Sequence, residues 1–352
     1  MTFLGRLFGQ SNIIHIHTDK QQYYAGDLVT GQVTLSVVQP LHVDGVYLKI
    51  NGNELTEFDV TRSRTVKDPH DPQKNIVETY TERVNGHHTF FRRRYCIYAT
   101  KSTLSSGNFV FPFQFQLDQK LPGTFEIYNK RQYSRSLQAS LRYHVEAEVA
   151  VPGMLKPNLY HSQDILINEP LRNMLMSSDT LKEAKVTFLC CIPKGTVTMS
   201  ANIDKNAYSP GETVQLHLIV DNSESQVDLE AFTLKLRKDL SVHAGSDTFY
   251  GNGTVIKASS PGVRAGDRAD RYIQLSLPHD TEPSTRSKLI ECEYELNVVL
   301  KVPWSPDVVT KQAVQIVAAQ RQDYVSKLQY PSGWEPSVMP MSDLQSMSYI
   351  SY

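Results

Sequence analysis

The sequence predicts an all-β protein built from two tandem β-sandwiches. Apolar and polar residues alternate with a period of two along many short stretches, which is typical of strands with one buried face. Helical periodicity is nearly absent, and only residues 95–104 and 170–185 have a helical pattern. A motif at residues 19–29 recurs at residues 204–214, which indicates a duplicated unit. At 352 residues, the chain is too long for one compact core and suits about two domains.

The alternating stretches are spread over both halves of the chain. They are residues 12–17, 31–37, 46–50, 109–117 and 141–149 in the first half, and residues 196–203 and 293–300 in the second. Between them lie clusters of Gly, Asn, Pro and Asp, whose backbone preferences favour turns over strand interiors. We therefore expect turns at Asn51-Gly52, Asn85-Gly86 and Ser209-Pro210-Gly211.

The internal repeat relates two strand–turn–strand motifs by a shift of 185 positions, from Asp19 to Asp204. The matched positions are Asp19 and Asp204, Lys20 and Lys205, Tyr23 and Tyr208, Gly26 and Gly211, Asp27 and Glu212, and Val29 and Val214. In each copy a tyrosine closes the turn, a glycine is able to adopt a positive φ angle, and an acidic residue follows. The later strands at residues 143–149 and 294–300 also match, so the similarity extends beyond one turn.

The repeat sets the expected domain limits. We assign residues 1–11 to an N-terminal extension, 12–168 to the first sandwich, 169–185 to a connector, 186–318 to the second sandwich and 319–352 to a tail. The tail is rich in Ser, Met, Pro and Tyr, a composition that predicts a mobile extension. No stretch approaches the ~20 apolar residues of a membrane span, and the apolar run at residues 1–9 is too short for a signal peptide.

Several short motifs occur in a fixed order along both halves. They are residues 23–31 (YYAGDLVTG), 45–52 (GVYLKING), 106–117 (SGNFVFPFQFQL), 121–126 (LPGTFE), 141–147 (LRYHVEA), 190–195 (CCIPKG), 208–212 (YSPGE) and 220–223 (VDNS). Each motif alone is a turn or strand sequence that is common in β-sandwiches. The ordered set resembles the arrestin clan, and most of all the α-arrestins, over about residues 12–318.

This resemblance implies a curved pair of arrestin-type, immunoglobulin-like sandwiches. It also implies a cytoplasmic adaptor, peripheral at the plasma membrane or endosomes, that binds the cytoplasmic tails of membrane proteins and links them to endocytosis, ubiquitination or endosomal sorting. An arrestin-like subunit of a retromer-type endosomal coat has the same double sandwich, so that alternative stays open.

Two departures from the family limit what the resemblance implies. Visual and β-arrestins carry lysines on the first strand for receptor phosphates, whereas residues 12–17 read NIIHIH, so the receptor-silencing role does not carry over. Many α-arrestins carry PPxY motifs that dock WW domains of HECT ubiquitin ligases. This chain contains no Pro-Pro pair, and the nearest segment is residues 330–336 (YPSGWEP). Direct recruitment of such a ligase is therefore not expected, and another adaptor would supply the link.

No catalytic residue, metal site or cofactor is expected from the sequence. It lacks the GxSxG, HExxH and GxxxxGK[ST] motifs. His15 and His17 share one strand face, but polar residues spaced by two usually form a solvated face. Cys96, Cys190, Cys191 and Cys292 have no CxxC spacing and suit reduced thiols. With a formal net charge of −1, the chain has no overall basic field for nucleic acid.

The strongest charge feature is a set of basic residues in the first half. Its members are Arg92, Arg93, Arg94, Lys130, Arg131, Arg135 and Arg142. Guanidinium groups bind phosphate in a bidentate manner, so Arg92, Arg94, Lys130, Arg131 and Arg135 are the candidate site for phosphorylated tails or anionic lipid. The alternative is a series of separate strand-edge charges that discourage aggregation. Because side chains alternate along a strand, Arg92 and Arg94 would share a face without Arg93.

Overall fold

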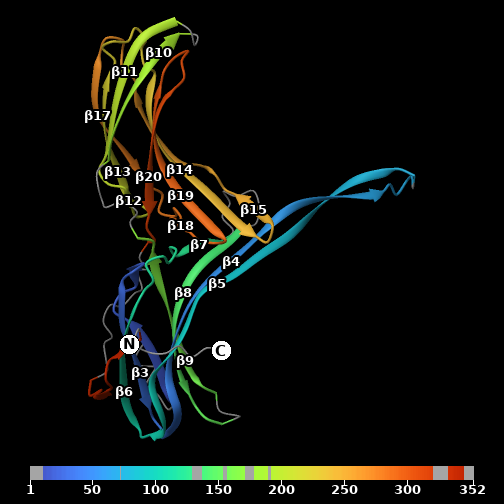
Figure 1. The fold of residues 1–352 in the computed structure, drawn as a ribbon, viewed down its shortest axis with the longest axis vertical. Helices are drawn as coiled ribbons and strands as arrows, with labels where there is room; N and C mark the ends of the chain where they lie inside the picture. The colour runs from blue at the N-terminus through green and yellow to red at the C-terminus, as the bar shows by residue number, and fades with distance from the viewer. Residues whose placement is uncertain are drawn as a thin grey trace.

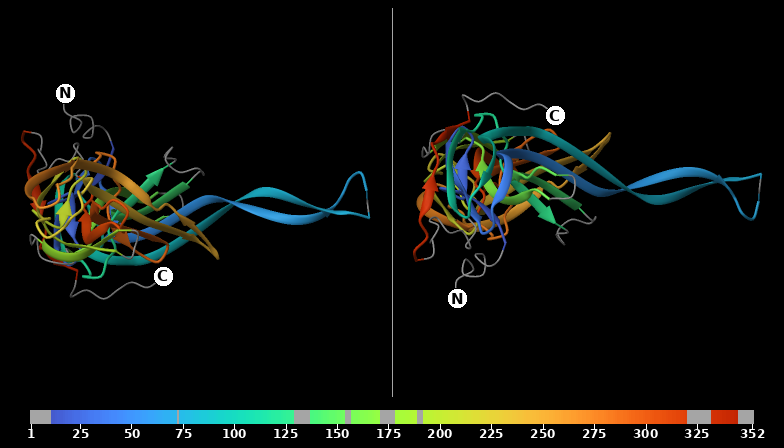
Figure 2. Two further views of the ribbon diagram at one scale, coloured as in Figure 1. Left: turned by 90° about the horizontal axis from the view of Figure 1, so that it is seen from above. Right: turned by 90° about the horizontal axis from the view of Figure 1, so that it is seen from below.

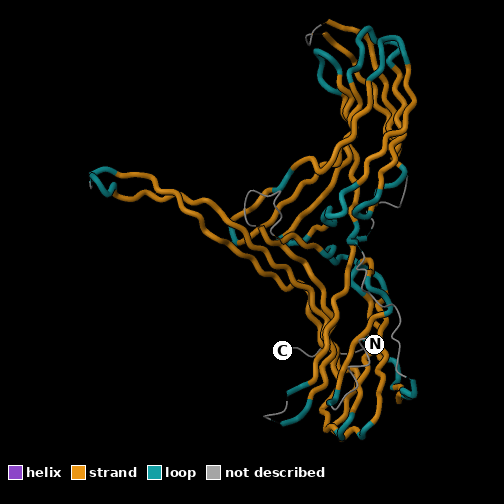
Figure 3. The backbone as a smooth tube through the Cα atoms, turned by 180° about the vertical axis from the view of Figure 1, so that it is seen from behind, coloured by secondary structure: helices purple, strands orange, loops and turns teal. Residues whose placement is uncertain are grey.

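Two β-sandwiches lie end to end along the long axis of the molecule (Figure 1). The computed structural model describes residues 11–71, 73–128, 137–153, 157–170, 178–188, 192–319 and 332–344. All regular secondary structure in these ranges is strand (Figure 3), which confirms the all-β prediction. A long two-stranded hairpin leaves the body near the junction of the two sandwiches (Figure 1) and projects sideways from it (Figure 2).

The N-terminal sandwich consists of two open sheets. One contains β1 (Ile13–Thr18), β3 (Leu28–Val37), β6 (Gly107–Gln116), β21 (Pro336–Val338) and β22 (Ser342–Asp343). The other contains β2 (Gln22–Tyr24), β9 (Leu159–Asn168), β8 (Leu137–Ala150), β4 (Leu41–Lys67), β5 (Asn75–Leu104) and β7 (Phe125–Tyr128). The alternating apolar side chains of the two sheets face each other and form the core, whose largest members include Phe58, Phe111, Phe113, Phe125 and Tyr143.

The C-terminal sandwich repeats this arrangement. Its smaller sheet contains β10 (Ser178–Phe188), β11 (Ile192–Ile203), β13 (Thr213–Asp221) and β17 (Arg268–Ser276). Its larger sheet contains β12 (Ala207–Tyr208), β20 (Val308–Ile316), β19 (Ile290–Lys301), β14 (Ala231–Ala244), β15 (Asp247–Tyr250), β16 (Gly253–Pro261) and β18 (Thr285–Arg286). Phe232 and Tyr208 are among the largest buried side chains here.

The repeated motif has the same tyrosine–aspartate hydrogen bond in both sandwiches. The Tyr23 hydroxyl donates to Asp19 Oδ1 at 2.6 Å, and the Tyr208 hydroxyl donates to Asp204 Oδ1 at 2.8 Å. Burial, followed by the bond to the aspartate, raises the pKa of Tyr23 well above its usual value, which keeps this phenol protonated as a donor.

The glycine of each motif has the backbone conformation that the sequence requires. Gly26 has φ 92° and Gly211 has φ 82°, in the region that side chains with a Cβ atom rarely adopt. The short strand of each motif then pairs in parallel with a late strand of the same sandwich, β2 with β9 and β12 with β20. The two sandwiches therefore begin with the same turn and close it in the same way.

Both helices expected from the sequence are wrong where the structure describes them. Residues 95–104 belong to β5, where Tyr95 and Ile97 face the core and pairing with β4 satisfies the backbone. Residues 178–185 belong to β10, which pairs with β11, and residues 171–177 lie outside the described residues. In both segments, ladder hydrogen bonds to a neighbouring strand outweigh the local helical pattern.

Two of the expected turns are also wrong. Asn51-Gly52 lies inside β4 and Asn85-Gly86 lies inside β5. A Cβ atom on Gly52 would lie 2.7 Å from the Phe90 ring, and one on Gly86 would lie 2.6 Å from Thr56 Oγ1. These glycines are therefore needed for close approach within a sheet, and β4 continues past them to Lys67.

Two segments that were expected to lie outside the sandwiches contain strands. β10 begins at Ser178, inside the stretch expected as a connector at residues 169–185. The tail expected as a mobile extension at residues 319–352 contains β21 and β22, which pair with β6 of the N-terminal sandwich.

Replacement of Tyr23 by phenylalanine tests the repeated turn. Tyr23→Phe removes the donor to Asp19, and we expect it to lower the free energy of unfolding by about 1–3 kcal/mol. Urea-induced unfolding measures this change. Tyr24→Phe is the control because the Tyr24 side chain is exposed, and equal stability of the two variants would contradict the assigned role.

Candidate functional site

The predicted arginines Arg92 and Arg94 lie on β5, the edge strand of the larger N-terminal sheet. Arg92 is exposed, whereas the Arg94 side chain is only 16% exposed. The Arg94 guanidinium stacks on the Tyr47 ring at 3.7 Å and donates to Glu148 Oε2 at 3.1 Å. Arg94 is therefore held in the sheet surface, and Arg92 is the more accessible of the two.

A small charge network surrounds Arg94 on this outer face. Lys49 Nζ lies 3.0 Å from Glu146 and 3.2 Å from Glu148. Burial raises the pKa of Glu148, but hydrogen bonds from Lys49 and Arg94 outweigh that effect and leave it below its usual value. Glu148 thus stays ionised and offsets part of the basic charge of this region.

The other predicted basic residues add no described contact to this network. Lys130, Arg131 and Arg135 lie outside the described residues. Arg142 is on β8 and forms an ion pair with Glu126 of β7. The phosphate or anionic-lipid site therefore stays a prediction, with Arg92 as its most exposed described member.

A feature that the sequence analysis missed is the arm, the part of the β4–β5 hairpin beyond Phe58 and Val84 (Figure 1). Ion pairs link the two strands of the arm: Arg62 with Glu82 at 2.7 Å, Arg64 with Glu78 at 2.8 Å, and Arg83 with Asp59 at 2.8 Å. The sequence predicts a turn at Asn51-Gly52 and therefore misses the arm. In the structure β4 ends at Lys67, just before residues 68–71 (DPHD), whose composition favours a turn.

The base of the arm is clasped to the C-terminal sandwich. The Arg62 guanidinium donates to both carboxylate oxygens of Asp247, at 3.1 and 2.8 Å. On the same two strands, β4 and β15, the centroids of the Phe58 and Phe249 rings lie 6.0 Å apart. A bidentate charge-assisted contact fixes orientation as well as distance, so it positions the arm against β15.

Side chains of the N-terminal sandwich also bond to the backbone of the C-terminal sandwich. Buried Glu54 accepts from the Leu289 N–H at 2.7 Å. Thr56 Oγ1 donates to the His243 carbonyl at 2.7 Å. Both contacts join a side chain of the N-terminal sandwich to a backbone group of the C-terminal sandwich. They satisfy these backbone groups and hold the two sandwiches together.

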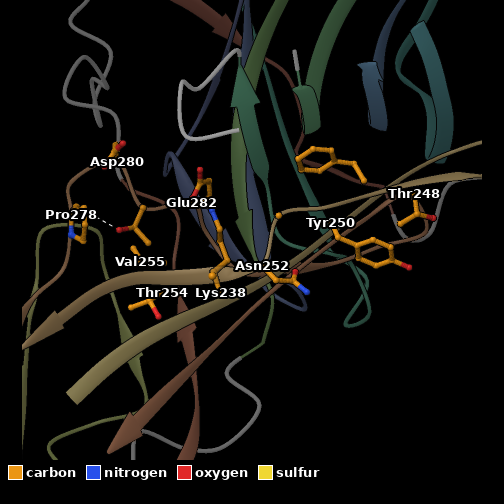
Figure 4. Close-up of a pocket in the computed structure, with 13 residues that line it drawn as sticks. Lys238, Thr248, Tyr250, Asn252, Thr254, Val255, Pro278, Asp280 and Glu282 are labelled. Atoms are coloured by element: carbon orange, nitrogen blue, oxygen red, sulfur yellow. Dashed lines mark hydrogen bonds and ion pairs between the residues drawn. The ribbon is translucent and has the colours of Figure 1, made fainter. Parts of the chain in front are cut away.

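A pocket with a volume of about 670 Å³ lies in the C-terminal sandwich (Figure 4). Lys238 and Glu282 line this pocket and form a buried ion pair, with 3.2 Å between Nζ and Oε2. Asn252, Thr254 and Asp280 also line the pocket. This polar lining would suit a small polar group.

The described cysteines lack the environment of a reactive thiol. Burial raises the pKa of Cys292 to about 12, and burial likewise raises the pKa of Cys96. A thiol that stays protonated at neutral pH is a poor nucleophile. Cys190 and Cys191 lie outside the described residues.

The His15 ring on β1 contacts the His161 ring on β9, where the two N-terminal sheets meet. The two ring centroids are 4.1 Å apart. Burial, followed by the neighbouring His161 and His17, lowers the pKa of His15 to about 4, and burial lowers that of His161. Among the described residues, no group of three His, Cys, Asp or Glu side chains could hold a metal ion.

Comparison with known proteins identifies both sandwiches. Residues 13–172 match the family "Arrestin (or S-antigen), N-terminal domain", and residues 193–332 match "Arrestin (or S-antigen), C-terminal domain". The chain belongs to the arrestin family. This confirms the arrestin-type fold expected from the ordered motifs. Within the described residues, no helix is long and apolar enough to cross a membrane.

Its relatives are arrestin-domain-containing proteins. The chain is 24% identical to "Arrestin domain-containing protein A" of Dictyostelium discoideum, over 90% of this chain and 53% of that protein. It is 26% identical to human "Arrestin domain-containing protein 1", over 58% and 46%, and 25% identical to bovine "Arrestin domain-containing protein 5", over 80% and 83%. The chain thus spans about half the length of the Dictyostelium and human relatives.

We expect the buried imidazole of His15 to make the stability of this arrestin-family chain depend on pH. In the unfolded chain His15 binds a proton near pH 6.5, whereas in the folded protein it does so near pH 4. The unfolded state therefore binds more protons between these values, and stability falls as the pH drops through that window. Thermal unfolding at a series of pH values measures this effect.

We expect His15→Gln to reduce the loss of melting temperature between pH 7 and pH 4.5, because it removes the imidazole that resists protonation. His42→Gln is the control, since His42 is exposed on β4. A wild-type acid response in the His15→Gln variant would contradict this assignment.

Proposed function

We propose that this arrestin-family chain is a non-enzymatic adaptor in membrane-protein trafficking, acting in endocytosis or endosomal sorting. In this proposal it is cytoplasmic, associates peripherally with the plasma membrane or endosomes, and binds the cytoplasmic tails of membrane proteins. The observation that carries the proposal is the pair of arrestin sandwiches clasped into one long body, through Arg62–Asp247 and Glu54–Leu289.

The shape of the molecule supports a role in binding. Extended strands, an arm and open sheets offer long surfaces with exposed backbone edges, which suit extended peptides. The described cysteines are protonated at neutral pH and do not supply a thiolate nucleophile. Because the sequence contains no Pro-Pro pair, a ubiquitin ligase would reach this adaptor through another protein.

Proximity labelling in the native cell tests the proposal. We expect membrane proteins with cytoplasmic tails, together with endocytic or sorting proteins, among the labelled partners. Native purification then distinguishes the alternative, because stoichiometric coat subunits would assign the chain to a retromer-type coat instead. Labelling that enriches neither membrane proteins nor sorting proteins would overturn the adaptor function.

The basic surface around Arg92 provides a second test. Arg92→Glu should weaken binding to phosphatidylcholine vesicles that contain phosphatidylserine by at least about fivefold, since one basic residue near an anionic surface contributes about 1 kcal/mol and the new carboxylate adds repulsion. Sedimentation with the vesicles at physiological salt measures binding. Arg268→Glu makes the same charge change at an exposed position of β17 and serves as the control. Equal binding of both variants and wild type would contradict a lipid site at Arg92.

A further inference from the structure

The outer face of the smaller C-terminal sheet carries large apolar side chains that are exposed. Because side chains alternate along a strand, β10, β11, β13 and β17 turn one set of residues into the core and the other set away from the sandwich. The outward set includes Leu181, Ile219 and Tyr272, which are 74%, 44% and 73% exposed. We call these three side chains the outer patch. β13 and β17 lie on the side of the C-terminal sandwich away from the arm (Figure 1).

Strand pairing brings the members of the outer patch together. Leu181 of β10 pairs with Ser200 of β11, and Ser200 pairs with Ile219 of β13. Neighbouring strands are about 4.8 Å apart, so the two aliphatic residues are about 10 Å apart with a small serine between them. Tyr272 of β17 is opposite His217, which is the next outward residue along β13 from Ile219. The outer patch is therefore continuous across the four strands of the sheet.

The polar contacts of this face do not cover the aliphatic side chains. The His217 ring stacks on the Tyr272 ring, with centroids 4.5 Å apart and planes 8° from parallel. His217 Nε2 also lies 2.7 Å from Asp270 Oδ1. Asp270 is the cross-strand neighbour of Ile219, but a carboxylate does not shield an aliphatic side chain from water. Stacking holds the Tyr272 ring in one orientation, which lowers the entropy that it would lose in a complex.

The internal repeat provides a comparison with the N-terminal sandwich. The shift of 185 positions relates His15 to Ser200 and Thr34 to Ile219, and the two residues of each copy pair directly with each other. Thr34 is only 9% exposed, and Val110, its partner on β6, is 5% exposed. This face is thus covered in the N-terminal sandwich, where it carries threonine, and exposed in the C-terminal sandwich, where it carries isoleucine. Water would favour the opposite arrangement, which indicates a contact with another molecule at Ile219.

Carboxylates border the outer patch and indicate the charge of that molecule. Glu183 is exposed two positions after the patch residue of β10, and the Asp270 side chain is 66% exposed. The basic residues of this face lie farther out, because Lys185 is two positions beyond Glu183 and Arg268 pairs with Asp221 at 3.0 Å. An anionic membrane would repel the bordering carboxylates, and a second copy would bring like charges together. A protein segment with Lys or Arg beside aliphatic residues is complementary to this face.

We propose that the outer patch docks a basic amphipathic segment of a partner protein. Its aliphatic side chains would cover Leu181, Ile219 and Tyr272, and its Lys or Arg side chains would lie beside Glu183 and Asp270. The proposal rests on the adaptor function in taking the chain to bind other proteins. The outer patch and Arg92 belong to different sandwiches, so the two surfaces can bind separate partners.

A binding assay with the purified full chain and defined peptides tests the outer patch. The probe is a fluorescent amphipathic peptide of leucine and lysine, and the comparison peptide has glutamate in place of lysine. At physiological salt we expect the lysine peptide to bind and the glutamate peptide not to bind. A Leu181→Thr/Ile219→Thr variant should weaken binding of the lysine peptide by at least about tenfold, because both aliphatic contacts are lost. Threonine keeps strand propensity, and Thr34 occupies the equivalent position of the other sandwich.

A matched control and a charge variant complete the assay. Leu28→Thr/Val77→Thr removes two exposed aliphatic side chains from other surfaces and should bind the lysine peptide as wild type does. Asp270→Asn should weaken binding of the lysine peptide by about two- to fivefold, since it removes one exposed charge contact. Three results would each overturn the proposal: no binding of the lysine peptide, equal binding of both peptides, or equal affinity of the two double variants.

Two further measurements identify other occupants. If Leu181→Thr/Ile219→Thr abolished sedimentation with phosphatidylserine vesicles, the outer patch would bind membrane and the protein partner would be wrong. If analytical ultracentrifugation showed a wild-type dimer that this variant lost, the occupant would be a second copy instead. Because the peptide assay uses purified components, its failure removes the outer patch and leaves the trafficking role untouched. Proximity labelling without membrane or sorting proteins would remove that role and leave the peptide binding.

Discussion

An open β-sheet ends in two strands whose outer N–H and C=O groups have no neighbour within the sheet, and this constraint shapes the whole molecule. Each sandwich contains two open sheets, so the chain has several such edges to protect. It protects the β1 edge with side chains of His161 and Gln163, and the β6 edge with the late strands β21 and β22. The same exposed groups that require protection are the groups by which an extended peptide binds.

The two sandwiches depend on a buried turn that the chain uses twice. A tyrosine hydroxyl bound to an aspartate, at Tyr23 and Tyr208, holds the short strand of each motif, β2 or β12, beside a late strand of its sandwich, β9 or β20. These late strands lead directly to the junction, where the Ala318 N–H donates to Asn168 Oδ1 at 2.8 Å. The turns therefore support the contact between the sandwiches as well as each fold.

The contact between Arg62 and Asp247 sets the direction of the arm. Arg62 belongs to the arm and Asp247 to the C-terminal sandwich, so their bidentate contact couples the direction of the arm to the arrangement of the two units. A two-stranded hairpin alone is marginally stable in water, and cross-strand ion pairs on exposed positions add little. The arm is stabilised mainly at its base, by Phe58 in the core and Phe249 beside it.

The sequence by itself determined the strand content, the duplication, the opening turns and the family, because alternation and turn chemistry act between residues that are close along the chain. It placed Arg92 and Arg94 on one strand face, but it misassigned Gly52 and Gly86, whose role depends on the side chains packed against them. Only the tertiary structure decided that Glu148 binds Arg94, that Asp247 binds Arg62 and that Ser342 reaches Ile97. The partners in these contacts are 54, 185 and 245 residues apart, so they meet only when the whole sheet order is fixed, and no local pattern records that order.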